Sequence, residues 1–308
     1  MRRLARAWTI ALLVGLGPWA ACQADTLRYC DQSAPLSAEQ KDRLLRLGAI
    51  IKEALEESGQ SHALIARSGL DLGRFGVRYS HAGLSLKAGL DTPWSVRQLY
   101  YACDEDKPRL FDQGISGFLL GLNDPAVGYV SVVLLPAAEA VALERAVLDN
   151  RQALQALGAT YSANAYPFST RYQNCNQWVM EMLATAWGRL AEAGSADDTT
   201  DLRARAQRWL MDQGYRPSVF EVGSRPLMWL GRLIPWLHDD DHPSADLEQR
   251  VYRVSMPASI EAFVQATTPA ALRIEFCHAG QRVVVHRGWD PIAEGCQPGE
   301  QDQVHSLQ

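Results

Sequence analysis

The stretch Arg171–Leu183 reads RYQNCNQWVMEML and places one cysteine where a polar loop becomes an apolar helix. If Asn174 is the helix N-cap, Cys175 lies in the first helical turn. Unpaired backbone amides and the positive end of the helix dipole favour the thiolate there, and the thiolate is the nucleophilic form. The alternative interpretation of Cys175 is a packing residue. The apolar positions share one face with the cysteine, which predicts an inward-packed helix: Trp178, Val179, Met182, Leu183 and Ala186.

A histidine lies in the predicted strand 79–87, which reads YSHAGLSLK. His81 alternates onto the same face as Gly83 and Ser85. These small neighbours predict that a helix can approach closely on that side. A cysteine–histidine pair needs such an approach, because the ring must take the thiol proton and later return it to a leaving group. The alternative is a half-buried structural histidine.

The two segments together resemble a known group of proteins. Residues 80–84, SHAGL, are similar to the strand motif S-H-x-G-hydrophobic of the circularly permuted papain-like proteins, and 174–178, NCNQW, to their helix motif N-C-x-x-aromatic. This group is related to the NlpC-type cell-wall peptidases and the lecithin:retinol acyltransferases. His81 precedes Cys175 by 94 residues, which is the permuted order. The whole chain also resembles an uncharacterised exported family, domain of unknown function 2145, which implies no activity.

The papain-like resemblance implies roles for individual residues. Cys175 would be the nucleophile and His81 the base. A third polar residue, which orients the imidazole, is expected on the next strand, WSVRQLYY. Gln98 is our choice there, and Arg97 stays open because the facing of that strand is undetermined. The oxyanion would be held by the backbone N–H of Cys175, with help from the residues Asn174 or Tyr172.

The reaction implied is acyl transfer through a thioester on Cys175, without a cofactor or a metal. The result is hydrolysis of an amide or ester if water is the acceptor, and transacylation if another nucleophile is. Cell-wall peptide is the default substrate by family analogy, and an acylated substrate is the other expectation. A non-catalytic binding module that retains the papain-like cleft is the alternative function.

The N-terminus carries three arginines, an apolar run over 7–17 and small residues up to Ala24, which is typical of a signal peptide cleaved after Ala24. The run is shorter than the about 20 residues that span a bilayer. Lipid anchoring at Cys22 is an alternative, although the bulky Trp19 stands where a small residue is usual. We expect an exported, periplasmic protein. Cleavage would change the formal charge from −5 to −8, which indicates neither nucleic-acid binding nor overall attraction to an anionic membrane.

Five cysteines would remain after cleavage, and the oxidising compartment that an exported protein reaches allows them to form disulfides. Cys277 and Cys296 flank a hairpin-like segment, and Cys30 and Cys103 lie in similar acidic turns. We predict these two pairs. The odd count then leaves Cys175 as a thiol.

The pattern of elements predicts an α+β fold: a permuted papain-like core with an antiparallel sheet on the cysteine helix, extra helices and a C-terminal β-hairpin. We assign 25–194 to the core and its N-terminal helix, and 195–308 to a helical and hairpin extension packed on it. The predicted elements include helices over 37–56 and 137–157 and a central strand over 127–136. The tail after Pro298 is predicted to be disordered.

Three other segments could carry function. His238–His242, HDDDH, contains metal-ligand types but is more typical of a solvated charge run. His278 and His286 follow Cys175 as the base does in unpermuted papains, although the small-residue face favours His81. The segment 225–237, RPLMWLGRLIPWL, suits a membrane-surface helix or an acyl-groove lid, while a core helix over the sheet is commoner. Peripheral membrane contact is therefore one expectation, beside a peptide or acyl substrate.

Overall fold

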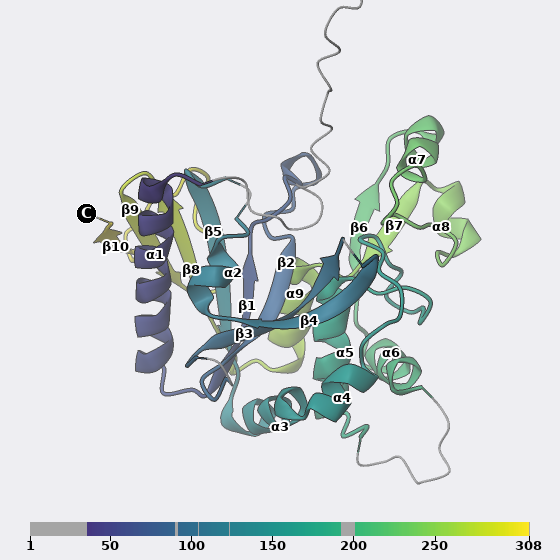
Figure 1. Cartoon of the computed structure of the whole chain (residues 1–308), viewed down its shortest axis with the longest axis horizontal. Helices are drawn as coiled ribbons and strands as arrows, with labels where there is room; N and C mark the ends of the chain where they lie inside the picture. Colours follow the sequence, from purple (N-terminus) through teal and green to yellow (C-terminus); the bar gives the residue numbers. More distant parts are fainter. Residues whose placement is uncertain (1–35, 90–91, 104, 123, 192–200, 308) are drawn as a thin grey trace, which may run out of the picture.

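The computed structural model describes residues 36–89, 92–103, 105–122, 124–191 and 201–307. They form a large antiparallel sheet with helices on both faces (Figure 1), so the predicted α+β class is confirmed. The strand order is β10-β9-β8-β5-β1-β2-β3-β4. Its strands are β1 His62–Arg67, β2 His81–Leu86, β3 Ser95–Ala102, β4 Lys107–Gln113, β5 Val127–Leu134, β8 Leu272–Ala279, β9 Arg282–Arg287 and β10 Gln303–Ser306.

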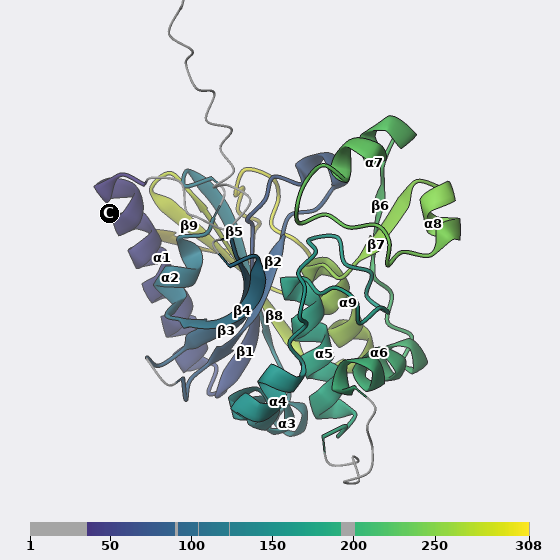
Figure 2. The same ribbon diagram turned by 45° about the vertical axis from the view of Figure 1, so that its right-hand side comes forward.

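The sheet is strongly curved, and two helices lie on its concave side (Figure 2). They are α1 (Ala38–Glu57) and the short α2 (Ile115–Leu119). Helix α1 begins with the predicted capping box, in which the side chains of Ser37 and Gln40 each accept a hydrogen bond from the other's backbone N–H. The apolar stripe of α1 and α2 packs on alternate residues of the strands, including Ile65, Val96, Val130, Val132, Ile274 and Phe276.

The opposite face of the sheet is covered by α5, the cysteine helix, with α3, α6 and α9 around it. Burial of apolar side chains between these helices and the sheet provides the main stabilisation of this layer. The bounds of the helices are α3 Ala137–Leu148, α4 Asn150–Gln155, α5 Cys175–Trp187, α6 Leu202–Asp212, α7 Arg225–Gly231, α8 Ser244–Glu248 and α9 Pro257–Thr267. None of the helices in the described part of the chain has the length and apolar character to cross a bilayer.

A separate two-stranded sheet, β6 (Ser218–Glu221) with β7 (Val251–Val254), carries α7 and α8. We call this unit, residues 218–254, the arm. It projects from the upper right of the molecule, and α7 lies at its far end (Figures 1 and 2).

Three sequence predictions need correction. The helix predicted over 137–157 is two helices, because Asp149 leaves the helical conformation and its carboxylate accepts from the backbone amides of Arg151 and Gln152, starting α4. The tail after Pro298 contains β10, which pairs with β9. Strand β8 pairs directly with β5, so the C-terminal hairpin belongs to the main sheet and does not merely pack on a core that ends at 194.

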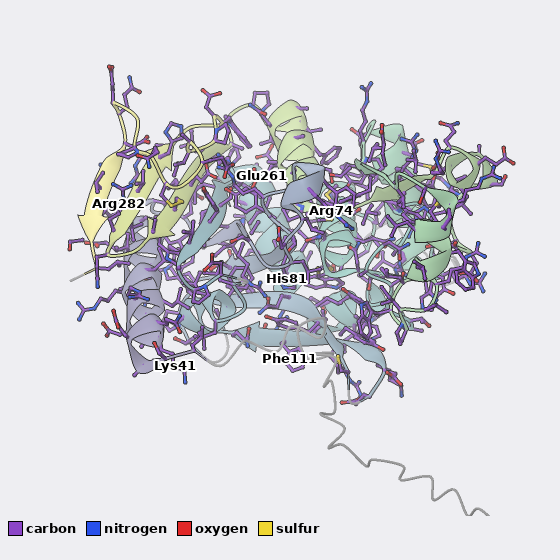
Figure 3. The ribbon with its side chains drawn as sticks, turned by 90° about the horizontal axis from the view of Figure 1, so that it is seen from above. Lys41, Arg74, His81, Phe111, Glu261 and Arg282 are labelled. Carbon is purple, nitrogen blue, oxygen red and sulfur yellow. A yellow bond between two sulfur atoms is a disulfide. The ribbon has the colours of Figure 1, made fainter. Side chains whose placement is uncertain are left out.

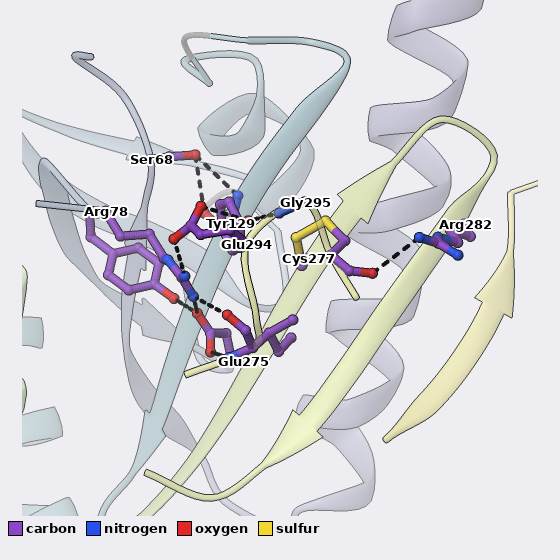
Figure 4. Close-up of a disulfide and its surroundings, with 11 residues drawn as sticks. Ser68, Arg78, Tyr129, Glu275, Cys277, Arg282, Glu294 and Gly295 are labelled. Atoms are coloured by element: carbon purple, nitrogen blue, oxygen red, sulfur yellow. Dashed lines mark hydrogen bonds and ion pairs between the residues drawn. A yellow bond between two sulfur atoms is a disulfide. The ribbon is translucent and has the colours of Figure 1, made fainter. Parts of the chain in front are cut away.

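The predicted disulfide between Cys277 and Cys296 is confirmed, with 5.5 Å between the Cα atoms. It ties β8 to the turn 289–297, beside an ionic cluster that runs from the buried Glu275 to the exposed Glu294 (Figure 4). There, Arg78 binds Glu275 at 3.0 Å and Glu294 at 2.6 Å. Cys103 is also disulfide-bonded. Its predicted partner, Cys30, lies outside the described residues, as do Cys22 and the predicted signal peptide.

Candidate active site

Cys175 is the first residue of α5, it is not in a disulfide, and 7% of it is exposed. Asn174 is the N-cap as predicted: its side-chain oxygen accepts from the Gln177 backbone amide at 2.7 Å. The Asn174 side-chain amide donates to the Ala163 carbonyl at 3.2 Å. The side chain thus fixes the start of the helix against the preceding loop.

His81 is the first residue of β2, and 6% of it is exposed. Seen from above, it lies near the middle of the molecule, between Phe111 of β4 and Glu261 of α9 (Figure 3). Its ring stacks on Tyr100, with 5.1 Å between the ring centroids. It also packs in a tilted arrangement against Phe118 of α2, with 5.9 Å between the ring centroids. These aromatic contacts fix the plane of the imidazole.

The His81 Nε2 atom lies 2.8 Å from the Gln98 side-chain oxygen. The Gln98 amide nitrogen donates in turn to the Gln113 oxygen at 2.7 Å, which also accepts from the Tyr100 hydroxyl at 3.3 Å. Because the oxygen of Gln98 can only accept, Nε2 carries a proton in this arrangement, and in the neutral ring Nδ1 has the lone pair. Gln98 therefore sets the tautomer of His81.

The other residue considered for this position, Arg97, points to the opposite side of β3. Its guanidinium forms a bidentate pair with Asp112, at 2.8 and 2.7 Å, and also donates to the Val147 carbonyl at 2.6 Å. It fastens the α3–α4 junction to β3 and β4. The structure thus brings Gln98, and not Arg97, to the histidine.

The first turn of α5 is hydrogen-bonded to the start of β2. The side-chain amide of Asn176 donates to the Ser80 carbonyl at 3.1 Å. These are the neighbours in sequence of Cys175 and His81, so both candidate residues lie at the same end of the α5–β2 interface. Sequence reasoning did not identify Asn176, although its place within the helix motif was a usable signal.

The cysteine helix does not approach the face of β2 that carries His81, Gly83 and Ser85, so that prediction is wrong. Helix α5 packs against the other side of β2, on Ala82 and Leu84, which share a hydrophobic cluster with Cys175. On the side of His81, the smallness of Gly83 serves the approach of β3: a Cβ there would lie 2.6 Å from Val96 Cγ1 and 3.0 Å from the Arg97 carbonyl oxygen. Cys175 and His81 are thus related through one end of the strand, not through the small-residue face.

Tyr172 lies under the side chain of His238, with 4.4 Å between ring centroids and 10° between planes. Burial, followed by a hydrogen bond to the Asp240 carboxylate, raises the pKa of Tyr172. Its hydroxyl is directed to Asp240 and its backbone carbonyl accepts from Arg203 at 2.8 Å. These contacts anchor the loop before Cys175.

The HDDDH segment is not a solvated charge run. The Asp241 carboxylate accepts from the Tyr166 backbone amide at 2.9 Å, and the His242 ring lies 2.7 Å from the Asn164 carbonyl oxygen. The side chains of Asp241 and His242 are both fully buried. Within the described ranges, no group of three or more potential metal ligands gathers here or elsewhere. The segment instead docks the arm on the loop 158–174.

A buried ionic network supports the same loop, and sequence reasoning missed it. Glu181 of α5 is fully buried and accepts from Arg203 Nε at 2.8 Å. Burial raises the pKa of Glu181, and the Arg203 guanidinium opposes that shift. Arg203 also donates to the Thr170 and Tyr172 carbonyls, at 2.7 and 2.8 Å. Three glutamines complete the shell of the carboxylate: Gln173, Gln177 and Gln207.

The two alternative bases lie away from α5. His286 of β9 is 2.6 Å from the Asp302 carboxylate. His278 of β8 is 1% exposed, and neither ring nitrogen has a hydrogen-bond partner among the described residues. Strand β8 is three places from β2 in the sheet, or roughly 14 Å at the usual strand spacing. The pairing with Gln98 is found only at His81.

Burial lowers the pKa of His278 to about 4. Between this value and the ordinary one near 6.5, the unfolded chain takes up a proton that the folded chain does not. The neutral, buried His278 therefore contributes to stability fully above pH 6.5, and this contribution is lost as the pH falls toward 4. At pH 5 the loss amounts to about 2 kcal/mol. Between pH 7.5 and pH 5, the free energy of unfolding of wild type should therefore fall by about 2 kcal/mol more than that of His278→Leu, as measured by urea unfolding. Parallel stability–pH curves for the two proteins would contradict this.

Comparisons with known proteins give one match. No curated protein and no solved structure matches the chain significantly. A family model described as "Uncharacterized protein conserved in bacteria (DUF2145)" matches residues 54–264, which include β2, β3 and the whole of α5. Since the match covers more than half of the sequence, this chain belongs to the DUF2145 family of proteins conserved in bacteria.

Proposed function

We propose that this protein is a thiol hydrolase or acyltransferase of the permuted papain-like kind, in which Cys175 forms a thioester and His81 moves the proton. The observation that carries the proposal is the 2.8 Å contact between His81 Nε2 and the Gln98 oxygen. It leaves Nδ1 as the proton acceptor of a ring held by Tyr100 and Phe118. The Asn176–Ser80 bond, which joins the ends of α5 and β2, supports the pairing.

The reaction would proceed in two acyl transfers. The thiol proton of Cys175 moves to His81 Nδ1, and the sulfur attacks the carbonyl carbon of an amide or ester. The carbon–nitrogen or carbon–oxygen bond breaks, and the leaving group takes the proton from the imidazolium. A water molecule, or another nucleophile, then gives a proton to Nδ1 and attacks the thioester. The carbon–sulfur bond breaks, and the Cys175 sulfur takes the proton back from the imidazolium, which restores the thiol and the neutral ring.

The oxyanion of each tetrahedral intermediate needs hydrogen-bond donors. The backbone N–H of Cys175 suits this role, because the first amides of a helix have no partner within it. Asn174 contributes by fixing these amides, since its side chain is engaged with Gln177 and Ala163. Tyr172, whose hydroxyl faces Asp240, contributes by anchoring the loop.

The substrate class and the place of action are part of the proposal. The papain-like resemblance supports a peptide or an acylated compound as substrate, with cell-wall peptide as the first to test. The N-terminal pattern of the sequence supports export to the periplasm. The disulfide between Cys277 and Cys296 is consistent with an oxidising compartment.

One observation favours a non-catalytic binding module instead: Cys175 is only 7% exposed. An activated ester separates the two functions. With p-nitrophenyl acetate, the sulfur should displace p-nitrophenolate and retain the acetyl group as a thioester. We expect a burst of one p-nitrophenolate per chain and an acetyl mass on the peptide that contains Cys175.

Cys175→Ala is the control for this experiment and should show neither the burst nor the added mass. An intact, folded protein that alkylates at Cys175 but is never acylated there would identify a reactive thiol without acyl-transfer activity. That result would leave the binding module as the function.

A further inference from the structure

The tip of the arm exposes an unusual concentration of large apolar side chains. Trp229 is 60% exposed and Leu233 is 66% exposed, while Met228 is the buried residue of α7. The sequence expectation that 225–237 is a core helix over the sheet is therefore wrong. Five of the thirteen strongly exposed large hydrophobic residues described lie within 219–233, which shows clustering: Val219, Leu227, Trp229, Leu230 and Leu233.

This exposure is built into a well-anchored unit. Ser224 caps α7, with Pro226 in its first turn, so the helix has its own start signals. Phe220 of β6 meets Phe75 in an edge-to-face contact with 5.3 Å between centroids. At the other end of the tip, the Trp236 carbonyl accepts from the Ala163 backbone amide at 2.9 Å. The apolar tip is thus held outward from both sides.

The charges on the tip have one sign. Between 222 and 238 there is no acidic residue, and Arg225 and Arg232 are both exposed. Arg232 donates to Asp239 at 2.7 Å but keeps 58% of its side chain exposed. The chain as a whole has a formal charge of −5, so the two arginines of the acid-free segment 222–238 favour contact with an anionic surface at this end of the molecule.

The size and shape of the tip distinguish between occupants. Helix α7 has seven residues and is therefore roughly 10 Å long. A stable protein interface usually needs about 800 Å² from each partner, which a projecting tip of this length does not offer. A bilayer makes no such demand, since a few apolar side chains can enter it while the arginines stay among the headgroups.

We propose that the tip, residues 225–235, docks this protein on an anionic phospholipid surface. Trp229, Leu230 and Leu233 enter the boundary between headgroups and acyl chains, and Arg225 and Arg232 bind lipid phosphates. The arm contacts the loop 158–174 through Trp236, so docking would hold that loop toward the membrane. The proposal does not depend on the thiol chemistry of Cys175.

The test uses the full chain and vesicles of phosphatidylcholine alone or mixed equally with phosphatidylglycerol. Brominated acyl chains quench tryptophans that enter the bilayer, so the quenching that is lost in Trp229→Phe reports on this side chain, even if another segment tethers the protein. We expect this Trp229-dependent quenching in the mixed vesicles. The double variant Leu230→Ser with Leu233→Ser should weaken vesicle binding, measured by the same quenching, at least tenfold, and Arg225→Gln should weaken it about fivefold.

The matched control is Leu154→Ser with Leu272→Ser, which removes two equally exposed leucines elsewhere and should leave the quenching unchanged. Equal quenching in wild type and Trp229→Phe would overturn the proposal. So would a dimer in solution that the Leu230 and Leu233 substitutions dissociate, because a second copy would then cover the tip. Thermal melting of each variant confirms that it is folded.

Discussion

Replacing His81 by alanine should shift the pH at which Cys175 alkylates at half its maximal rate upward by about two units, or about 2.7 kcal/mol. A cysteine paired with an imidazolium has a pKa of roughly 3.5 to 7.5, whereas a thiol without such a partner titrates near 8.5. Wild type should therefore react rapidly with iodoacetamide at pH 6. Because a less basic thiolate is also intrinsically less nucleophilic, the rate at pH 6 should fall only about tenfold in the variant.

The controls for this experiment come from the same sheet. His286→Ala removes a histidine that is bound to Asp302 and should leave the alkylation profile of Cys175 unchanged. Gln98→Leu keeps the imidazole but removes the group that sets its tautomer, and should produce a smaller shift in the same direction. If His81→Ala alkylates as wild type does at every pH, the helix terminus alone activates the thiol, and the base assigned here is wrong.

The start of α5 shows why part of the site is readable in the sequence. An Asn-Cys pair before an apolar helical pattern specifies the cap and the first turn through contacts within four residues, and the structure has both. The alternation of β3 likewise limits the partner of His81 to one of two neighbours. Choosing Gln98 over Arg97 depends on which face of β3 lies beside β2, which the local pattern cannot reveal.

The errors arise where tertiary contacts decide. Strand periodicity shows that His81, Gly83 and Ser85 share a face, but the helix that covers that face comes from another part of the chain. The pattern of 225–237 is apolar whether a sheet covers it or not, so the sequence alone could not predict that Trp229 is exposed. Strand β10 is short and polar, and only its pairing with β9 makes it a strand.

The ionic pair of Glu181 and Arg203 was missed for a related reason. A single glutamate within a strongly apolar helix was a usable signal, because a buried carboxylate needs partners. Its partner, however, lies on a different helix, and the remaining donors come from glutamines that look unremarkable in the sequence. The loop that they hold carries Tyr172 and leads directly to Cys175, so the network bears on the site.

Arg203→Met should lower the free energy of unfolding by about 3 to 5 kcal/mol, a large share of the about 5 to 15 typical of a folded protein. The substitution leaves the Glu181 carboxylate buried without its cation, and it removes the donors to the Thr170 and Tyr172 carbonyls. The control is Arg109→Met, which breaks the exposed pair with Glu105 and should leave the free energy of unfolding almost unchanged. Urea unfolding followed by tryptophan fluorescence measures both.

A double variant tests whether the unpaired charge causes the loss. In Glu181→Met with Arg203→Met no charge is left unpaired at this site, so part of the stability lost in Arg203→Met should return, by at least about 1 kcal/mol. The recovery should be incomplete, because Gln173, Gln177 and Gln207 lose the acceptor that they share. If the losses of unfolding free energy in the two single variants simply add in the double variant, Glu181 and Arg203 are not coupled. The stability of the loop then comes from the backbone carbonyls that Arg203 binds.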